Sequence, residues 1–163
     1  MPEGFNFEFI DEKHTDFIIS CRNDSKIIDL SLSKTELTIE KQQLFLEQYQ
    51  NMDRIDLILT DILSLNPVGI FTIKNISKQP ELGKIIGNND YKGKGLAKAA
   101  SKSIIDFGFR ILNLKKIYAV TRSDNTINIA LNGKLGFQIQ EVITKKKQEW
   151  LIMSLTANTF YEQ

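Results

Sequence analysis

Alternating apolar and polar positions mark the strands of this chain. Phe5, Phe7 and Phe9 alternate with polar neighbours, which predicts a strand with one buried face. Apolar runs bounded by turn residues predict six further strands. These lie at 55–62, 68–73, 82–86, 116–121, 137–143 and 150–155.

Helical spacing appears in four places, at 16–23, after Thr38, at 96–112 and at 125–135. Thr38 is suited to cap the second helix, and Gly136 to end the fourth. The third helix is predicted to bury Ala97, Ala100, Ile104, Phe107 and Ile111. The mixed order of strands and helices predicts an α/β or α+β fold.

The composition limits the class of protein that this chain can form and its expected cellular location. At 163 residues, with 42% hydrophobic and 25% charged residues, the chain is expected to form one globular domain, 1–163. The net charge of +1 predicts no nucleic-acid partner. The first residues do not resemble a signal peptide, and no apolar run approaches a membrane span of about 18 residues. We expect a soluble cytoplasmic protein with no membrane partner.

The chain has one cysteine, Cys21, and one histidine, His14. A single cysteine excludes an internal disulfide, and the pair cannot make a Cys-rich or multi-His metal site. We therefore predict no metal centre. Cys21 falls on an apolar helical face, which favours a core position over a nucleophile.

The most distinctive segment is the loop that precedes the third helix, Asn88 to Gly95. Glycines before a helix N-terminus let a phosphate approach unpaired amides, and Lys92 and Lys94 add positive charge. A solvated surface loop is the competing interpretation. The P-loop pattern fails because Gly87 lies six residues before Gly93, and the dinucleotide pattern fails because its third glycine would fall at Lys98.

The loop, together with a second motif, resembles the GNAT superfamily of acyl-CoA-dependent N-acyltransferases. That family carries Q/R-x-x-G-x-G/A, and residues 90–95 match both glycines but have Asp90 at the first position. The segment Asn125–Phe137 resembles the family's N-x-x-(A/S)-I-x-L-Y-E-K-L-G-F. Residues 21–24 also resemble the branch that holds ribosomal-protein-type N-terminal acetyltransferases and amino-sugar N-acetyltransferases.

The resemblance implies a mostly antiparallel mixed sheet flanked by helices, and acetyl-CoA as the acetyl donor. It implies that amides of the glycine loop hold the pyrophosphate, with Asn125 as a further contact. By its residue type and its place at the start of the fourth helix, Asn125 is also suited to be a helix cap. It implies an oxyanion-binding amide within Ile85–Gly87. The implied cofactor-binding residues are Ile85, Ile86, Gly87, Lys92, Gly93, Lys94, Gly95, Leu96, Ala97 and Asn125.

Three side chains are the catalytic candidates that the resemblance implies. Glu81 occupies the place of a general base, and Asp61 is a weaker candidate. Asn132 stands where many relatives have a tyrosine general acid, and an amide cannot donate a proton at neutral pH. Tyr118 on the preceding strand is the possible substitute, although a buried structural role is the alternative.

These features predict transfer of an acetyl group from acetyl-CoA to a primary amine, by direct attack on the thioester. The branch resemblance offers an amino sugar or a protein N-terminal amine as the acceptor. The assembly is expected to be a monomer or a homodimer, the latter through exposed strand edges. Asn132 and Asp90 keep a second hypothesis open, a non-catalytic acyl-CoA-binding module. A nucleotide-sugar binder of another kind is the third.

Overall fold

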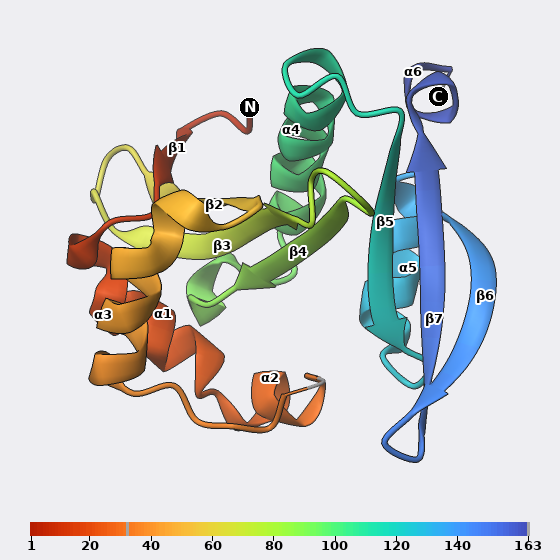
Figure 1. Cartoon of the computed structure of the whole chain (residues 1–163). Helices are drawn as coiled ribbons and strands as arrows, with labels where there is room; N and C mark the ends of the chain where they lie inside the picture. Colours follow the sequence, from red (N-terminus) through yellow and green to blue (C-terminus); the bar gives the residue numbers. More distant parts are fainter. Residues whose placement is uncertain (32, 163) are drawn as a thin grey trace.

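Seven strands form one mixed sheet in the computed structural model, which describes residues 1–31 and 33–162. The strand order is β1-β2-β3-β4-β5-β7-β6, and every neighbouring pair is antiparallel except β4 and β5 (Figure 1). The strands are β1 (Phe5–Phe9), β2 (Arg54–Asp61), β3 (Pro67–Lys74), β4 (Glu81–Ile86), β5 (Lys116–Arg122), β6 (Gln138–Lys145) and β7 (Gln148–Thr156).

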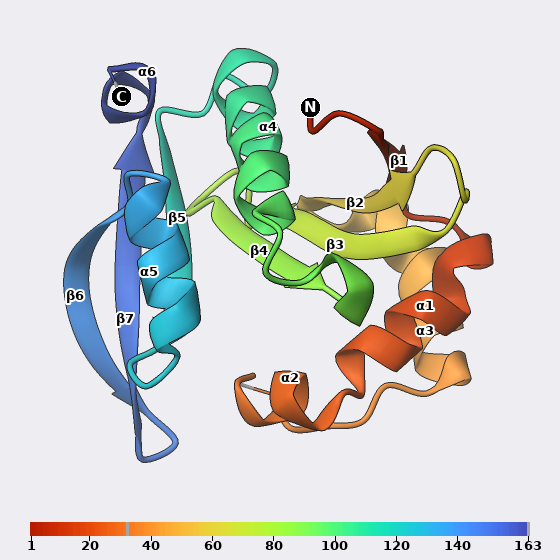
Figure 2. The same cartoon turned by 180° about the vertical axis from the view of Figure 1, so that it is seen from behind.

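Within the described residues, six α-helices connect and cover these strands (Figure 2). They are α1 (Thr15–Arg22), α2 (Ser25–Asp29), α3 (Ile39–Gln48), α4 (Leu96–Arg110), α5 (Thr126–Lys134) and α6 (Ala157–Tyr161). Three short 3-10 turns are η1 (Glu12–His14), η2 (Tyr49–Asn51) and η3 (Asn89–Tyr91). Among the described residues, no helix is long and apolar enough to cross a membrane.

The sheet separates two apolar clusters. The larger one joins buried residues of α4 to both halves of the sheet, with Phe71, Ile105 and Leu155 among its most buried members. The smaller one lies under α1 and contains Ile18, Cys21, Ile58 and Ile70. A residue's place in one cluster or the other follows from strand alternation, which sends neighbouring side chains to opposite faces.

The predicted elements are confirmed, with small differences at their ends. Thr38 caps α3 through Lys41 N, and Gly136 follows α5 with φ 92°. Helices α2 and α6 were not predicted, because five-residue helices are too short to show a helical period.

The predicted buried face of α4 is partly wrong. Ala100 and Ile104 are buried, but Ile111 is 65% exposed, and Ala97 and Phe107 are only half-buried. The buried stripe instead runs through residues spaced three and four apart: Leu96, Ala100, Ser101, Ile104, Ile105, Gly108 and Phe109. The helix packs on the sheet along this stripe and ends at Arg110, so Ile111 falls beyond it.

Close packing of α1 on the end of β4 generates a stability prediction. A Cβ at Gly87 would lie 2.0 Å from Cys21 Sγ and 3.1 Å from the ring of Phe17. Gly87→Ala is therefore expected to lower the free energy of unfolding by about 1–3 kcal/mol, the usual cost of overpacking. Urea unfolding followed by circular dichroism measures the loss.

Gly83→Ala, within β4 itself, is the matched control. Its added Cβ would meet only Thr72 Cβ, at 3.6 Å, which is ordinary contact. Combining Gly87→Ala with Cys21→Ala removes the clashing sulfur and should recover part of the loss. Equal stability of the Gly87→Ala and Gly83→Ala variants would contradict the packing argument.

Candidate functional site

The two parallel strands in the middle of the sheet meet at one end only. Glu81 and Tyr118 are the one pair in register in the described chain, and Tyr118 N donates to Pro80 O at 2.7 Å. Beyond that point β4 and β5 diverge toward their carboxyl ends (Figure 1). The divergence leaves a splay whose inner edges carry backbone groups not used in strand pairing.

Alternation along β4 decides which amides face this splay. Gly87 N donates to Val68 O of β3 at 3.0 Å. In an antiparallel pair, successive residues direct their N–H and C=O groups to opposite edges. The amides of Ile86 and Lys84 therefore face β5, so Ile86 is the member of the predicted interval Ile85–Gly87 whose amide can meet an oxyanion in the splay.

The glycine loop leads from the end of β4 to the N-terminus of α4. Gly93 and Gly95 have φ of 75° and 77°. The amides of Gly93, Lys94, Gly95, Leu96 and Ala97 have no hydrogen-bond acceptor among the described residues. Five free amides at the positive end of a fifteen-residue helix form an anion-binding nest, and this arrangement fits a pyrophosphate.

Contacts with β1 and β2 hold this loop in place. The hydroxyl of Tyr91 donates to Asp61 Oδ2 at 2.8 Å, and its ring packs edge-on against Phe5. Asp61 also accepts from the amides of Leu63 and Ser64. Hydrogen bonds from the Ser64 amide and the Tyr91 hydroxyl lower the pKa of Asp61, so its carboxylate is committed to the β2–β3 turn.

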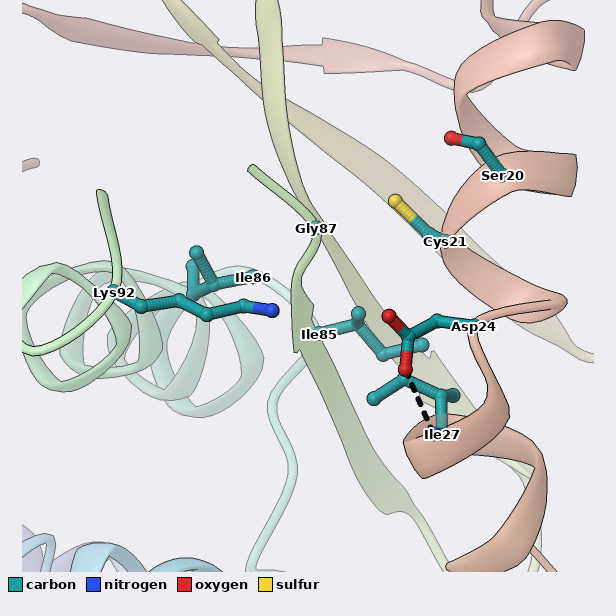
Figure 3. A pocket seen from close by; sticks show the side chains of 8 residues that line it. All are labelled: Ser20, Cys21, Asp24, Ile27, Ile85, Ile86, Gly87 and Lys92. Carbon is teal, nitrogen blue, oxygen red and sulfur yellow. Dashed lines mark hydrogen bonds between the residues drawn. The ribbon is translucent and has the colours of Figure 1, made fainter. Parts of the chain in front are cut away.

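A small pocket lies at the carboxyl end of β4 (Figure 3). It lies between α1, α2, β4 and the glycine loop, and its empty space is about 250 Å³ when the space open to solvent is included. Figure 3 shows Asp24 and Lys92 on opposite sides of the strand end. The lining residues are Ser20, Cys21, Asp24, Ile27, Ile85, Ile86, Gly87 and Lys92.

Two of the polar lining groups already have partners. Asp24 accepts from the amides of Lys26 and Ile27 and so caps α2, while Lys92 Nζ donates to Asn89 Oδ1 at 2.7 Å. Cys21 is buried, and desolvation raises the pKa of its thiol to about 11. A thiol with this pKa is protonated at neutral pH, so it packs in the pocket wall as a hydrophobic group.

The structure brings one group of the predicted residues together. Ile85, Ile86, Gly87 and Lys92 line the pocket, and the free amides of 93–97 begin beside them. Asn125 caps α5 by accepting from Asn128 N at 3.2 Å. Asn125 thus has the structural role expected of a helix cap, and any contact with a donor is additional.

Two predicted catalytic residues lie elsewhere, at the closed end of the splay. Glu81 begins β4, five residues before its last residue, and pairs with Lys74 Nζ at 3.0 Å. Tyr118 is its partner in register on β5, with Lys116 Nζ 5.9 Å from its ring. Neither side chain lines the pocket at Ile85–Gly87.

Asn132 lies inside the protein beside Lys84, a residue that was not predicted to belong to the site. Its side chain is 0% exposed, and Asn132 Oδ1 accepts from Lys84 Nζ at 2.6 Å. Lys84 is half-buried, and desolvation lowers its pKa to about 8. The available signal was a single lysine within the otherwise uncharged run Leu82–Gly87.

His14 and the acidic residues do not add a metal site. His14 is buried, and its Nδ1 accepts from the backbone amide of Asp11 in the η1 turn. No group of three or more His, Cys, Asp or Glu residues that could hold a metal ion occurs in the part of the chain that the structure describes.

Comparisons with known proteins agree with this architecture. The profile of the acetyltransferase (GNAT) domain family matches residues 7–138. Over 73 residues the chain is 37% identical to spermidine N(1)-acetyltransferase of Escherichia coli K12, a match that covers 45% of this chain and 39% of that protein. An uncharacterized N-acetyltransferase, p20, of Bacillus licheniformis is 39% identical over 70 residues, covering 43% of this chain and 39% of p20. The match thus spans about two fifths of the length of these relatives.

Solved structures share the fold over almost the whole chain. Spermidine N-acetyltransferase from Vibrio cholerae, in complex with CoA and spermine, superposes with a TM-score of 0.86 at 19% identity, covering 97% of this chain and 98% of that one. A dodecameric form of the Vibrio cholerae enzyme gives 0.80 at 20% identity, with 96% of each chain covered. At this identity the likeness shows the fold.

The predicted resemblance and the predicted mixed sheet are therefore confirmed. The profile match covers the pocket, the glycine loop and the whole Asn125–Phe137 motif. The chain belongs to the GNAT acetyltransferase domain family, whose enzymes use acetyl-CoA.

Proposed function

We propose that this protein transfers the acetyl group of acetyl-CoA to a primary amine by direct attack of the amine on the thioester. Family membership supports the reaction class. The observation that carries the proposal is the set of five free amides at 93–97, placed next to a pocket at the open end of the splay. This arrangement can bind a phosphorylated donor and an acceptor side by side.

The donor side is formed mostly by backbone groups. The amides of Gly93 to Ala97 would hold the pyrophosphate, and the exposed ammonium of Lys94 adds charge next to them. The free edge of β4 offers backbone groups to the amide-bearing pantetheine arm, as a strand edge does to an extended peptide. The donor supplies an activated acyl group, and the amide of Ile86 is positioned to stabilise the oxyanion that forms on it.

The acceptor side lies between α1, α2 and the end of β4. Asp24 is the one carboxylate among the residues that line the pocket, so it is suited to attract an ammonium group. A carboxylate in the pocket wall favours a cationic aliphatic amine such as spermidine, the substrate named for the relatives in Escherichia coli and Vibrio cholerae.

An alkylammonium with a pKa of about 10.4 must lose a proton before it can attack a thioester. Glu81 is at the far end of β4 and is paired with Lys74. We assign the proton's path to Asp24 and to water at the pocket mouth, because Asp24 is the one carboxylate among the lining side chains. The protein is proposed to act in the cytoplasm as a monomer or homodimer.

A second acceptor class has one observation in its favour. A neighbouring hollow is lined by Arg22 and Lys41 together with the hydroxyls of Ser31, Ser33 and Thr35, and by Glu36 and Leu37. Two cations, one anion and three hydroxyls suit an anionic group, such as the diphosphate of a nucleotide-linked amino sugar. This acceptor remains the alternative to an aliphatic amine, and a protein N-terminal amine has no comparable feature.

Release of free CoA thiol tests the function directly. The chain is incubated with acetyl-CoA and, in separate reactions, spermidine, a nucleotide-linked amino sugar, and a peptide with a free N-terminus. Turnover with spermidine supports the proposal, and turnover with the amino sugar alone transfers it to the second class. CoA binding without thiol release from any amine would favour the non-catalytic module instead.

The glycine loop yields a binding prediction with a matched control. Gly93→Ala is expected to weaken CoA binding about tenfold or more. A left-handed conformation costs an L-residue roughly 1–2 kcal/mol, and a loop backbone that changes to relieve this strain would move the free amides away from the pyrophosphate. Gly4→Ala carries the same strain, with φ of 79° and open space around it, but lies at the start of β1. Isothermal titration calorimetry should show normal CoA binding for Gly4→Ala; equal weakening in both variants would contradict the assignment.

Asp24 yields a kinetic prediction. Asp24→Asn keeps an oxygen that can cap α2 but removes the charge, so the KM for the amine should rise severalfold while the KM for acetyl-CoA stays unchanged. The effect is modest because an exposed ion pair contributes about 0–1 kcal/mol. Asp16→Asn, an exposed position on α1, is the control. An unchanged amine KM in Asp24→Asn would remove Asp24 from the acceptor site.

A further inference from the structure

Lys84 is the only charged residue within β4 after Glu81, and its side chain faces the interior. By strand alternation it points to the same face as buried Leu82, the face covered by α4 and α5. Its Nζ donates to Asn132 Oδ1 at 2.6 Å, and Asn132 Nδ2 donates to Met153 Sδ at 3.6 Å. A lysine amine is thus fixed at a defined position between β4, α5 and β7.

Stability does not explain this lysine. No ion pair with a carboxylate is found for Lys84 in the described chain, and its hydrogen bond goes to a neutral amide. A cation withdrawn from water without a counter-charge costs free energy. Desolvation is the cause that lowers the pKa of Lys84 to about 8, and no charged group from α4, α5 or β7 contributes.

Its position places this amine near the proposed reaction. The next two residues, Ile85 and Ile86, line the pocket, and the amides of Lys84 and Ile86 both face the splay. Acetyl-CoA whose pyrophosphate is bound by the amides of residues 93–97 would lie along the free edge of β4. Its thioester end would then pass the amides of Lys84 and Ile86. Any proton donor to its sulfur must come from the walls of the splay.

We propose that Lys84 is the general acid that protonates the departing thiol sulfur during thioester aminolysis. The inference rests on the proposed function. The amine nitrogen forms a bond to the acyl carbon, and the carbonyl oxygen becomes an oxyanion. When the carbonyl re-forms, the C–S bond breaks and its electron pair takes a proton from Lys84 Nζ. The acceptor nitrogen loses a proton to solvent, and Lys84 takes up a proton from solvent, so that the protons balance.

The other side chains near the splay are less suited to this role. Asn132 has an amide side chain, which cannot donate a proton at neutral pH. Tyr118 is paired with Glu81 at the closed end. An acid works best when its pKa is near the working pH, and a thiol has a pKa of about 8.5. Asn132 is assigned as the positioning residue that orients the lysine.

Two substitutions separate proton donation from charge alone. Lys84→Met removes both the proton and the charge, while Lys84→Arg keeps a cation that does not release its proton. The control is Lys102→Met, an exposed lysine on α4. Thermal unfolding checks that each variant folds, and calorimetry with CoA checks donor binding.

The readout independent of turnover is the ultraviolet absorbance of the thiolate of bound CoA, with desulfo-CoA as the blank. A cation near the sulfur lowers the pKa of the bound thiol in the unsubstituted chain and in Lys84→Arg. In Lys84→Met the thiolate should appear at higher pH. Unchanged thiolate titration in Lys84→Met would place Lys84 away from the sulfur and overturn the proposal.

The kinetic readout is the dependence of kcat on pH, measured with the amine that gives turnover in the thiol-release assay. The unsubstituted chain should lose activity as the pH rises through about 8, because Lys84 then loses its proton. Lys84→Met and Lys84→Arg should both show a kcat lower by about 10- to 100-fold, without that falling limb.

Two failures are distinguishable. If the unsubstituted chain binds CoA but none of the amines tested causes release of the CoA thiol, the proposed function is overturned, and the acid role with it. An active chain in which either lysine variant keeps the normal kcat and the falling limb overturns only the acid role.

Discussion

The parting of β4 from β5 is the constraint on which the rest of this structure depends. β4 is committed to β3 over its whole length, and β5 is committed to β7, while the two share the single register pair Glu81–Tyr118. The sheet therefore stays continuous at one end and opens at the other. Unpaired backbone groups inside a sheet cost free energy unless water or a ligand forms hydrogen bonds with them. The opening is therefore suited to bind a ligand.

Two polar ties hold other elements around this opening. Tyr91 fastens the glycine loop to Asp61 at the end of β2. Arg122, only 8% exposed at the end of β5, donates to the Asp29 carbonyl and to the Asp29 and Asp124 carboxylates. Since Asp29 is the last residue of α2, this arginine connects the acceptor-side helix to the far strand of the splay.

The pair Lys84 and Asn132 shows how the same opening shapes the chemistry. An amide at position 132 cannot act as an acid, but its oxygen can hold an ammonium at 2.6 Å. The proton donor is thereby assigned to β4 instead of α5. Cys21 remains an inert wall group because burial raises the pKa of its thiol to about 11, so the site is expected to work without a covalent enzyme intermediate.

Local patterns in the sequence determined the strands, the longer helices, the glycine loop and the caps at Thr38 and Asn125. These features depend on side-chain periodicity and on the backbone preferences of a few neighbouring residues, which a sequence displays directly. The tertiary structure alone decided that Glu81 lies at the closed end of the splay while Lys84, three residues later, reaches Asn132. Strand pairing and side-chain direction bring together residues 48 positions apart, and no local pattern records which partner a buried polar group will meet.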